Sequence, residues 1–241
     1  MMNKQRELSE TIALIPSGAT IMVGGFGSPG TPFTLLDELL RQGQDHLTLI
    51  KNDANEPGYG IAKLIEADRV DTLIASHIGL NREAVQRLNS GKLKVEFHPQ
   101  GILAEKIRAA GAGIFGFLSD IGIETEITDP SQIIEWQVDK SCAKRKLKVE
   151  TALHADFALI HAARADHFGN LLYTDSAINF NPLMAMAAEN VFAETFNLEP
   201  PGTFPPEHIH TPCAFVSAVI ALNREQALQS QYELMEHYVE D

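Results

Sequence analysis

Apolar positions along the first half of the chain alternate between two spacings, one typical of strands and one of helices. Short β-branched runs predict strands at residues 20–23, 46–50, 71–76 and 93–97. Apolar residues three and four positions apart predict helices at residues 5–14, 33–40, 59–67 and 101–110, and another that begins after Asn81. Because strands and helices alternate, the pattern predicts an α/β fold, with a largely parallel sheet covered by helices.

The second half continues this pattern less regularly. Apolar runs predict strands at residues 155–162 and 171–173, and a helix at 183–188 that Asn181 would cap. A last helix should begin after Asn223, with an apolar stripe that packs on its own domain or on another subunit: Leu228, Tyr232, Met235 and Val239. With 44% hydrophobic residues, 241 residues suffice for one sizeable core, so we expect residues 1–241 to form a single domain.

The segment that follows the first predicted strand, residues 24–32, is rich in glycine. Thr31 is a candidate N-cap for the next helix, and Pro32 suits the first helical position. Right-handed crossovers place every strand-to-helix loop at the carboxyl edge of the sheet, where α/β proteins bind ligands. This loop would therefore offer backbone N–H groups to an anion or a carbonyl oxygen.

The glycine loop also satisfies a dinucleotide fingerprint. Gly25, Gly27 and Gly30 have the spacing G-x-G-x-x-G, and Asp53 lies where an acid would bind a ribose. An NAD-dependent oxidoreductase is therefore one alternative, and a purely structural turn is another. Prolines delay the helix until after the last glycine, which argues against the dinucleotide interpretation.

Composition and charge exclude several classes of function. The formal net charge of −13 repels polyanions, so we expect no nucleic-acid partner. No segment has the length of a membrane span or the pattern of a signal peptide, so we expect no membrane association. Cys142 and Cys213 are isolated, which suits a reducing compartment and predicts a cytoplasmic protein.

A possible metal site near the end of the chain is weak. His208 and His210 would lie on one face of a strand and Cys213 follows them, but the sequence shows no fourth ligand. Flanking prolines favour a structural turn instead. We therefore expect no metal and no permanently bound cofactor, and the roles of these three residues stay open.

Several motifs together resemble a known family. The order Gly24-Gly25-Phe26, three residues, then Gly30-Thr31-Pro32 resembles the signature of the A (alpha) subunits of family I CoA-transferases, the 3-oxoacid and acetate-acetoacetate types. Asn52 matches the first of two asparagines in that family and Asp53 replaces the second. Further matches are His98-Pro99-Gln100-Gly101, with His98 in place of threonine, Gly169-Asn170-Leu171 and Asn179-Phe180-Asn181-Pro182. The resemblance runs from Ser28 to Val216, apart from residues 126–148.

The resemblance implies a chemistry and a partner. Such enzymes move coenzyme A between short-chain or 3-oxo carboxylic acids, and a glutamate attacks the acyl-CoA thioester to form an anhydride and then a glutamyl-CoA thioester. That glutamate belongs to the B (beta) subunit, and its motif is not found in this sequence. We therefore expect a CoA-transferase fold, coenzyme A as a substrate, and activity only with the B subunit, in a heterotetramer. An acyl-CoA hydrolase on the same scaffold is the alternative.

The resemblance also predicts the residues of the site. Gln100 would donate its amide hydrogen to the acyl oxygen or the oxyanion, which a carboxamide does without titrating. Without the resemblance, a polar cap on the following helix is the simpler role for Gln100. The predicted substrate-binding residues are Gly24, Gly25, Phe26, Gly30, Asn52, Asp53 and Gly101, with the role of Asp53 left open by its departure from the family pattern. The loops that carry these residues should converge at one edge of the sheet.

Overall fold

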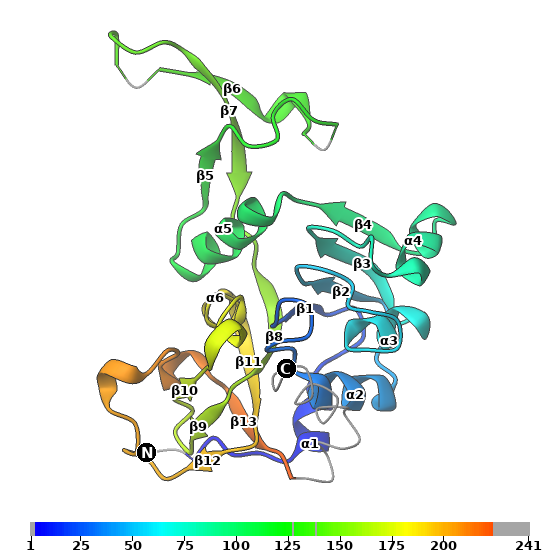
Figure 1. The fold of residues 1–241 in the computed structure, drawn as a ribbon, viewed down its shortest axis with the longest axis vertical. Helices are drawn as coiled ribbons and strands as arrows, with labels where there is room; N and C mark the ends of the chain where they lie inside the picture. Colours follow the sequence, from blue (N-terminus) through cyan, green and yellow to red (C-terminus); the bar gives the residue numbers. More distant parts are fainter. Residues whose placement is uncertain (1–2, 127, 138, 224–241) are drawn as a thin grey trace, which may run out of the picture.

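A parallel sheet of seven strands forms the centre of the molecule, in the order β13-β11-β8-β1-β2-β3-β4 (Figure 1). The computed structural model describes residues 3–126, 128–137 and 139–223. The strands are β1 (Thr20–Val23), β2 (Leu47–Ile50), β3 (Val70–Ala75), β4 (Lys94–Phe97), β8 (Ala155–His161), β11 (Ala188–Thr195) and β13 (Ala218–Ala221). The predicted α/β fold with a parallel sheet is confirmed.

Helices cover both faces of this sheet. They are α1 (Leu8–Ile12), α2 (Phe33–Gln42), α3 (Ile61–Glu66), α4 (Arg82–Asn89), α5 (Gln100–Gly111) and α6 (Asn181–Ala187). Side chains of β1 alternate between two cores, with Ile21 and Val23 in the core under α2 and α3, and Met22 in the core under α5 and α6. The first helix is shorter than the predicted 5–14, because Gln5 pairs with Val219 next to the sheet.

The chain reverses direction across the sheet at β1. From β1 it moves outward through β2, β3 and β4, and later strands return to the other side, where β8 pairs with β1. The carboxyl ends of β1 and β8 therefore border a topological switch point, the usual ligand crevice of an open α/β sheet.

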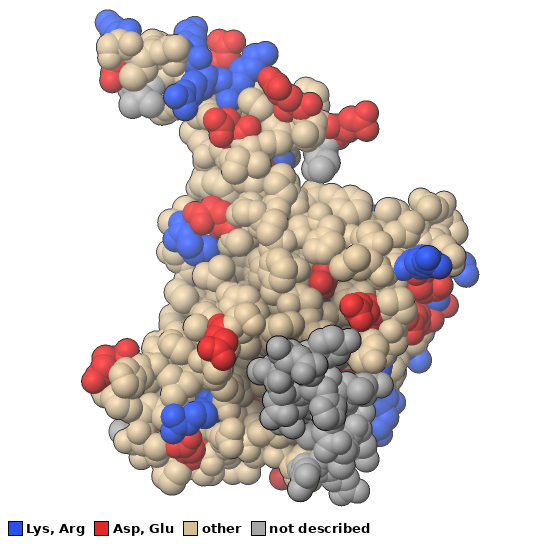
Figure 2. All heavy atoms as spheres, viewed as in Figure 1, with Lys and Arg blue, Asp and Glu red and all other residues tan. Residues whose placement is uncertain are grey.

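A three-stranded antiparallel sheet projects from the body as an arm, at the top of Figure 1. Its strands are β5 (Gly116–Ser119), β6 (Ile133–Trp136) and β7 (Arg145–Thr151). Figure 2 shows basic and acidic side chains crowded on this arm. Most of the arm lies in the segment that the family resemblance did not cover, and the sequence analysis predicted none of its strands.

Smaller elements complete the fold. A second three-stranded sheet holds β9 (Arg164–Asp166), β10 (Leu171–Leu172) and β12 (Leu198–Glu199). Short 3₁₀ helices are η1 (Pro130–Gln132), η2 (Asp175–Ala177), η3 (Pro206–His208) and η4 (Cys213–Phe215). The helix predicted after Asn223 lies outside the described residues. None of the helices within the described ranges has the length and apolar character to cross a membrane.

Candidate active site

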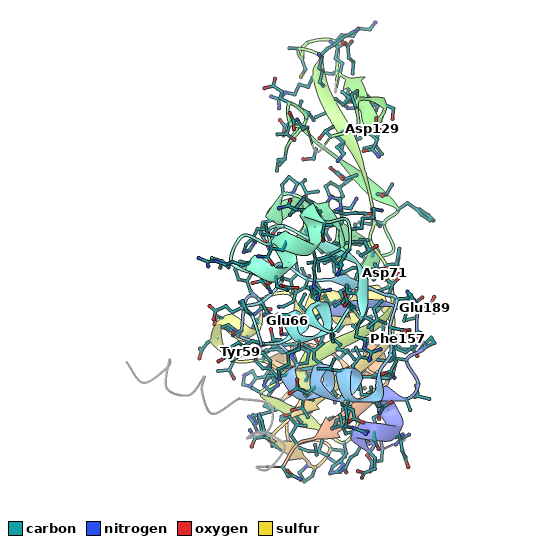
Figure 3. The ribbon with its side chains drawn as sticks, turned by 90° about the vertical axis from the view of Figure 1, so that its right-hand side faces the viewer. Tyr59, Glu66, Asp71, Asp129, Phe157 and Glu189 are labelled. Carbon is teal, nitrogen blue, oxygen red and sulfur yellow. The ribbon has the colours of Figure 1, made fainter. Side chains whose placement is uncertain are left out.

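The glycine loop and the loop after β2 are joined at the carboxyl edge of the sheet. The backbone N–H of Gly27 donates to Asn52 Oδ1 over 3.3 Å, and Asn55 Nδ2 donates to the Gly27 carbonyl over 2.9 Å. Figure 3 shows Tyr59, from the loop after β2, on the opposite side of the molecule from Asp71 and Glu189, which lie near the amino ends of β3 and β11. Two of the three predicted loops therefore meet, as the topology requires.

Ser76 links these loops to the third one, which begins at His98. The Ser76 backbone N–H donates to the Asn52 carbonyl over 3.0 Å. The Ser76 hydroxyl lies 2.6 Å from the same oxygen and 2.5 Å from Gln100 Oε1. Because a hydroxyl carries one hydrogen, it donates to one of these oxygens at a time. Asn52 and Gln100 are thus brought together through a residue that the sequence analysis saw only as the end of a strand.

Gln100 is the first residue of α5, and Pro99 is the N-cap. The Gln100 side chain bonds to Ser76 and makes no capping bond to α5, so the alternative role as a helix cap is wrong. Its Nε2 donates no hydrogen bond to any residue that the structure describes. The amide therefore keeps a free donor on a partly exposed side chain.

Asn52 is fully buried beneath the loops. Its Oδ1 accepts from Gly27, whereas its Nδ2 is buried and has no partner among the described residues. An unpaired buried donor costs about 1–3 kcal/mol and is rare in folded proteins. This orphaned amide hydrogen marks the joint between the two loops as a place where a ligand could supply the missing acceptor.

Close packing fixes the glycine loop. A Cβ on Gly24 would lie 1.9 Å from Asn181 Oδ1, and one on Gly25, whose φ is +95°, would lie 2.3 Å from Thr31 Oγ1. The Thr31 hydroxyl donates to the Gly27 carbonyl over 2.7 Å. The predicted N-cap role of Thr31 is wrong, because Pro32 is the N-cap of α2 and Thr31 instead closes the loop on itself.

Asn181 holds the other side of the glycine loop. It is the fully buried first residue of α6, whose N-cap is Phe180, so the predicted capping role is wrong. Its Nδ2 donates to the Gly30 carbonyl over 3.1 Å, and its Oδ1 accepts from the backbone of His161 over 3.4 Å. It therefore ties the loop to the end of β8, at the switch point.

Phe26 is one of two exposed residues of the predicted site. Its side chain is 47% exposed, and its ring lies 6.4 Å from the ring of Phe180, nearly parallel to it. Gly101 is also exposed, on the first turn of α5, and a Cβ added to it would meet no atom within 4 Å. Among the predicted residues these two are open to an incoming ligand.

Lys51 is the functional candidate that the sequence analysis missed. It follows β2 and is fully buried under the glycine loop. Its Nζ lies 3.2 Å from the Gly27 carbonyl, 3.4 Å from that of Gly24 and 3.2 Å from Thr31 Oγ1. Burial lowers the pKa of Lys51 to about 8, and Asp53, whose Oδ1 is 3.8 Å away, opposes this change. A lysine after a strand gives no sequence signal for burial, because most lysines are exposed.

A small cavity of about 80 Å³ lies between the glycine loop and the loops after β2 and β3. It is lined by Gly27, Ser28, Asp53, Ala54, Asn55, Glu56, His77, Ile78, Leu80 and Asn81. Asp53 Oδ1 accepts from the backbone of Asn55 over 3.1 Å. Its position in this cavity wall places Asp53 beside a small, partly open space at the end of the glycine loop.

Two of the three residues considered for a metal, His210 and Cys213, make structural contacts, and the third, His208, ends the 3₁₀ helix η3. The Tyr173 backbone N–H donates to His210 Nδ1 over 2.9 Å, and the two rings stack with centroids 5.9 Å apart. The backbone N–H of Cys213 donates to Asn170 Oδ1 over 2.9 Å. Within the described ranges, no group of three or more His, Cys, Asp or Glu side chains is placed to hold a metal ion.

Fold and geometry together define an α/β protein with a candidate ligand site at the carboxyl edge of a parallel sheet, built on a glycine loop and two carboxamides. The chain belongs to the coenzyme A transferase family, whose model matches residues 6–222. It is therefore an enzyme subunit of the transferase type, and the nicotinamide interpretation of the glycine loop loses its support.

Three similar proteins illustrate the relationship. The alpha chain of a probable coenzyme A transferase of Bacillus subtilis is 45% identical, over 90% of this chain and 93% of its own. The alpha chain of the acetate CoA-transferase of Escherichia coli is 42% identical, over 91% and 97%. The crystal structure of glutaconate coenzyme A-transferase from Acidaminococcus fermentans shares the fold, with a TM-score of 0.78 at 20% identity, over 92% of this chain and 77% of that one.

Proposed function

We propose that this chain is the A (alpha) subunit of a CoA-transferase that moves coenzyme A between short-chain or 3-oxo carboxylic acids. The observation that carries the proposal is the hydrogen-bonded line from the glycine loop through Asn52 and Ser76 to Gln100, which ends in a free amide donor. The cavity of about 80 Å³ supports a short acyl chain, since about 10–15 Å³ accommodates one water-sized group.

The proposed reaction uses a glutamate of the partner chain. Its carboxylate oxygen attacks the thioester carbonyl carbon, and the carbonyl oxygen becomes an oxyanion. Collapse of this intermediate expels the coenzyme A thiolate and leaves an acyl-glutamyl anhydride. The thiolate then attacks the glutamyl carbonyl, releases the first acid as a carboxylate and leaves a glutamyl-CoA thioester. The acceptor acid reverses these steps and leaves as the new acyl-CoA.

This chain would stabilise the oxyanion. Gln100 Nε2 is the donor that we assign to the acyl oxygen, because it is free and stands on the first turn of a helix. The substrate-binding assignments stay as predicted: Gly24, Gly25, Phe26, Gly30, Asn52, Asp53 and Gly101. Asn52 would hold Gly27 through its Oδ1 and offer its unpaired Nδ2 to a substrate oxygen, whereas the exposed Phe26 and Gly101 would contact substrate directly.

The proposal includes a partner chain and a compartment. Relatives are named as the alpha chains of their enzymes, which supports assembly with a B subunit, and we propose an A₂B₂ heterotetramer in the cytoplasm. Coenzyme A enters as a substrate, and we propose no permanently bound cofactor.

A reconstitution experiment tests the proposal. The chain is purified alone and together with the B subunit encoded by a neighbouring reading frame, and thioester exchange is measured for pairs of acyl-CoA donor and acceptor acid. We expect exchange only with both chains present. Robust exchange by this chain alone would contradict the assignment of the nucleophile to the partner.

The hydrolase alternative needs one further measurement. Free thiol release is followed in the reconstituted assembly with no acceptor carboxylate added. A transferase releases at most a stoichiometric amount of thiol under these conditions, whereas a hydrolase turns over continuously. Continuous release would favour the acyl-CoA hydrolase.

A further inference from the structure

Lys51 is a buried cation that the proposed reaction does not use. It is the largest of the fully buried side chains in the described ranges, and its ammonium contacts neutral oxygen atoms on both sides of the glycine loop. Moving an ammonium group from water into a protein interior costs several kcal/mol, and an apolar side chain of similar volume is often as stable in such a position. A charge retained here calls for a functional explanation.

The contacts of Lys51 point to the glycine loop. The carbonyls of Gly24 and Gly27 belong to the peptide groups whose N–H atoms are those of Gly25 and Ser28. A hydrogen bond accepted by the carbonyl of a peptide polarises that peptide and strengthens its N–H as a donor. Neither N–H has a hydrogen-bond partner within the described part of the chain.

We propose that Lys51 is a positioning residue for acyl transfer, whose ammonium fixes the Gly24 and Gly27 carbonyls and makes the glycine loop electropositive toward the acyl oxyanion. The ammonium is fully buried, so it acts through the loop. This inference rests on the proposed function.

The protonation of Lys51 gives the proposal a measurable signature. Its neighbours on the glycine loop are uncharged, and Asp53 from its own loop is the charged group that faces it among the described residues. Burial lowers the pKa of Lys51 to about 8. Above this pH the neutral amine loses its polarising charge, so the rate of acyl transfer should decline while the loop stays in place.

The test compares Lys51→Gln with the wild type in the complete assembly with the B subunit. Glutamine keeps an N–H donor for the loop carbonyls but has no charge. We expect a fall in kcat of about tenfold, smaller than the about 10²–10³ typical of a direct oxyanion donor, and a KM for acyl-CoA within about twofold of wild type. The wild-type kcat should decline through pH 8, and the variant should lack this decline.

Lys94→Gln is the matched control, because Lys94 pairs with Glu96 on the surface and is far less buried than Lys51. It should keep the wild-type kcat and the decline through pH 8. A Lys51→Gln assembly with wild-type kcat and an unchanged pH profile would overturn the role of Lys51 alone. If that variant does not assemble, a wild-type kcat that stays flat between pH 7 and 9.5 would overturn it. Failure of the wild type to transfer coenzyme A between any pair of acids would instead refute the proposed function.

Discussion

Single residues of the site connect its loops mostly through uncharged groups. Asn52, Ser76 and Gln100 form a line of contacts across three loops, and amides and hydroxyls do not titrate near neutral pH. Hydrogen bonds between such groups keep the three loops in the same arrangement over a wide pH range. Lys51, beneath this line, is the exception that titrates.

Gln100→Ala tests the free amide donor. We expect kcat in the reconstituted assembly to fall by about 10²–10³, because the oxyanion loses a fixed donor. The free energy of unfolding should change by less than about 1 kcal/mol, since the side chain is partly exposed and alanine favours a helix. Gln86→Ala, on the exposed side of α4, should leave kcat unchanged. A kcat within threefold of wild type for Gln100→Ala would show that Gln100 does not act on the oxyanion.

Two glycine substitutions separate packing from helix propensity. Gly24→Ala places a methyl group against Asn181 and should cost about 1–3 kcal/mol in the free energy of unfolding. Gly101→Ala meets no atom within 4 Å and should gain about 0.5–1 kcal/mol, because alanine replaces glycine in α5. Chemical unfolding of both variants measures the difference. Equal stability of the two variants would mean that Asn181 moves aside without cost.

The lowered pKa of Lys51 also predicts how stability depends on pH. Between about pH 8 and the ordinary lysine pKa of about 10.4, the unfolded chain holds the Lys51 proton and the folded chain does not. The free energy of unfolding should therefore rise with pH across this window, by roughly 2 kcal/mol relative to Lys51→Met. Urea unfolding of both proteins at pH 7.5 and pH 10 measures the difference. A constant gap between them would contradict the prediction.

Among the elements, α5 and the arm are joined by a buried charge cluster. Glu150 on β7 contacts Lys106 of α5 over 3.3 Å and Lys148 of its own strand over 3.0 Å, and all three are buried. Two ammonium groups share one carboxylate, so the cluster keeps one positive charge. Burial, reinforced by nearby Lys106, lowers the pKa of His98 and favours its neutral form beside this cluster.

Glu150→Gln should strongly weaken the attachment of the arm. It leaves two buried lysines without a counter-charge, which should cost about 3–5 kcal/mol in the free energy of unfolding. Glu135→Gln on β6 is the control, since Glu135 is exposed and its pair with Lys144 spans 3.8 Å; it should cost less than about 1 kcal/mol. Thermal unfolding and hydrogen exchange in the arm measure both effects. A loss for Glu150→Gln no larger than the control would show that water reaches the cluster.

Comparison of the central sheet with the arm shows where sequence patterns predict strands correctly and where they fail. Strands β1, β2 and β3 were predicted because their apolar runs are mostly buried, as the pattern requires, and the apolar residues of β4 are partly buried. In β7 the usual burial of apolar residues and exposure of charged ones is inverted, because Lys148 and Glu150 are buried and Val149 is exposed. β11 was missed as well, and it carries the fully buried Glu194, which accepts from the backbone of Leu35 over 2.9 Å.

The candidate site was likewise predicted in part: the sequence indicated where its loops lie, but not which side chains fasten them. Topology alone brought the three loops to one edge, because strand ends in a parallel sheet share an edge. The residues that fasten the loops, Ser76, Lys51 and Asn181, depend on where single side chains point, and spacing in the sequence does not encode this direction. Pairing of a buried charge is likewise visible only in three dimensions.

For the whole molecule, charge and cavity shape together limit the acids that suit the proposed transfer. The chain carries a formal net charge of −13, and the cavity wall adds the carboxylates of Asp53 and Glu56. A monocarboxylic acid has a single carboxylate, and this is the group that reacts, so its acyl chain brings no charge into the cavity. A dicarboxylic acid of the same length would bring a second negative charge into a small space beside Asp53, and like charges close together repel by several kcal/mol when they are partly buried.

We therefore expect the reconstituted assembly to use butyrate better than succinate, which has the same number of carbons, by at least about tenfold in kcat/KM. Asp53→Asn should reduce this ratio. Glu189→Gln removes the same charge from the amino-terminal side of the sheet (Figure 3) and should leave the ratio unchanged. Added salt should reduce only the long-range part of the preference, because a Debye length of about 8 Å at 0.15 M screens distant charges and spares Asp53. Equal use of succinate and butyrate by the wild type would show that the second carboxylate does not enter this cavity.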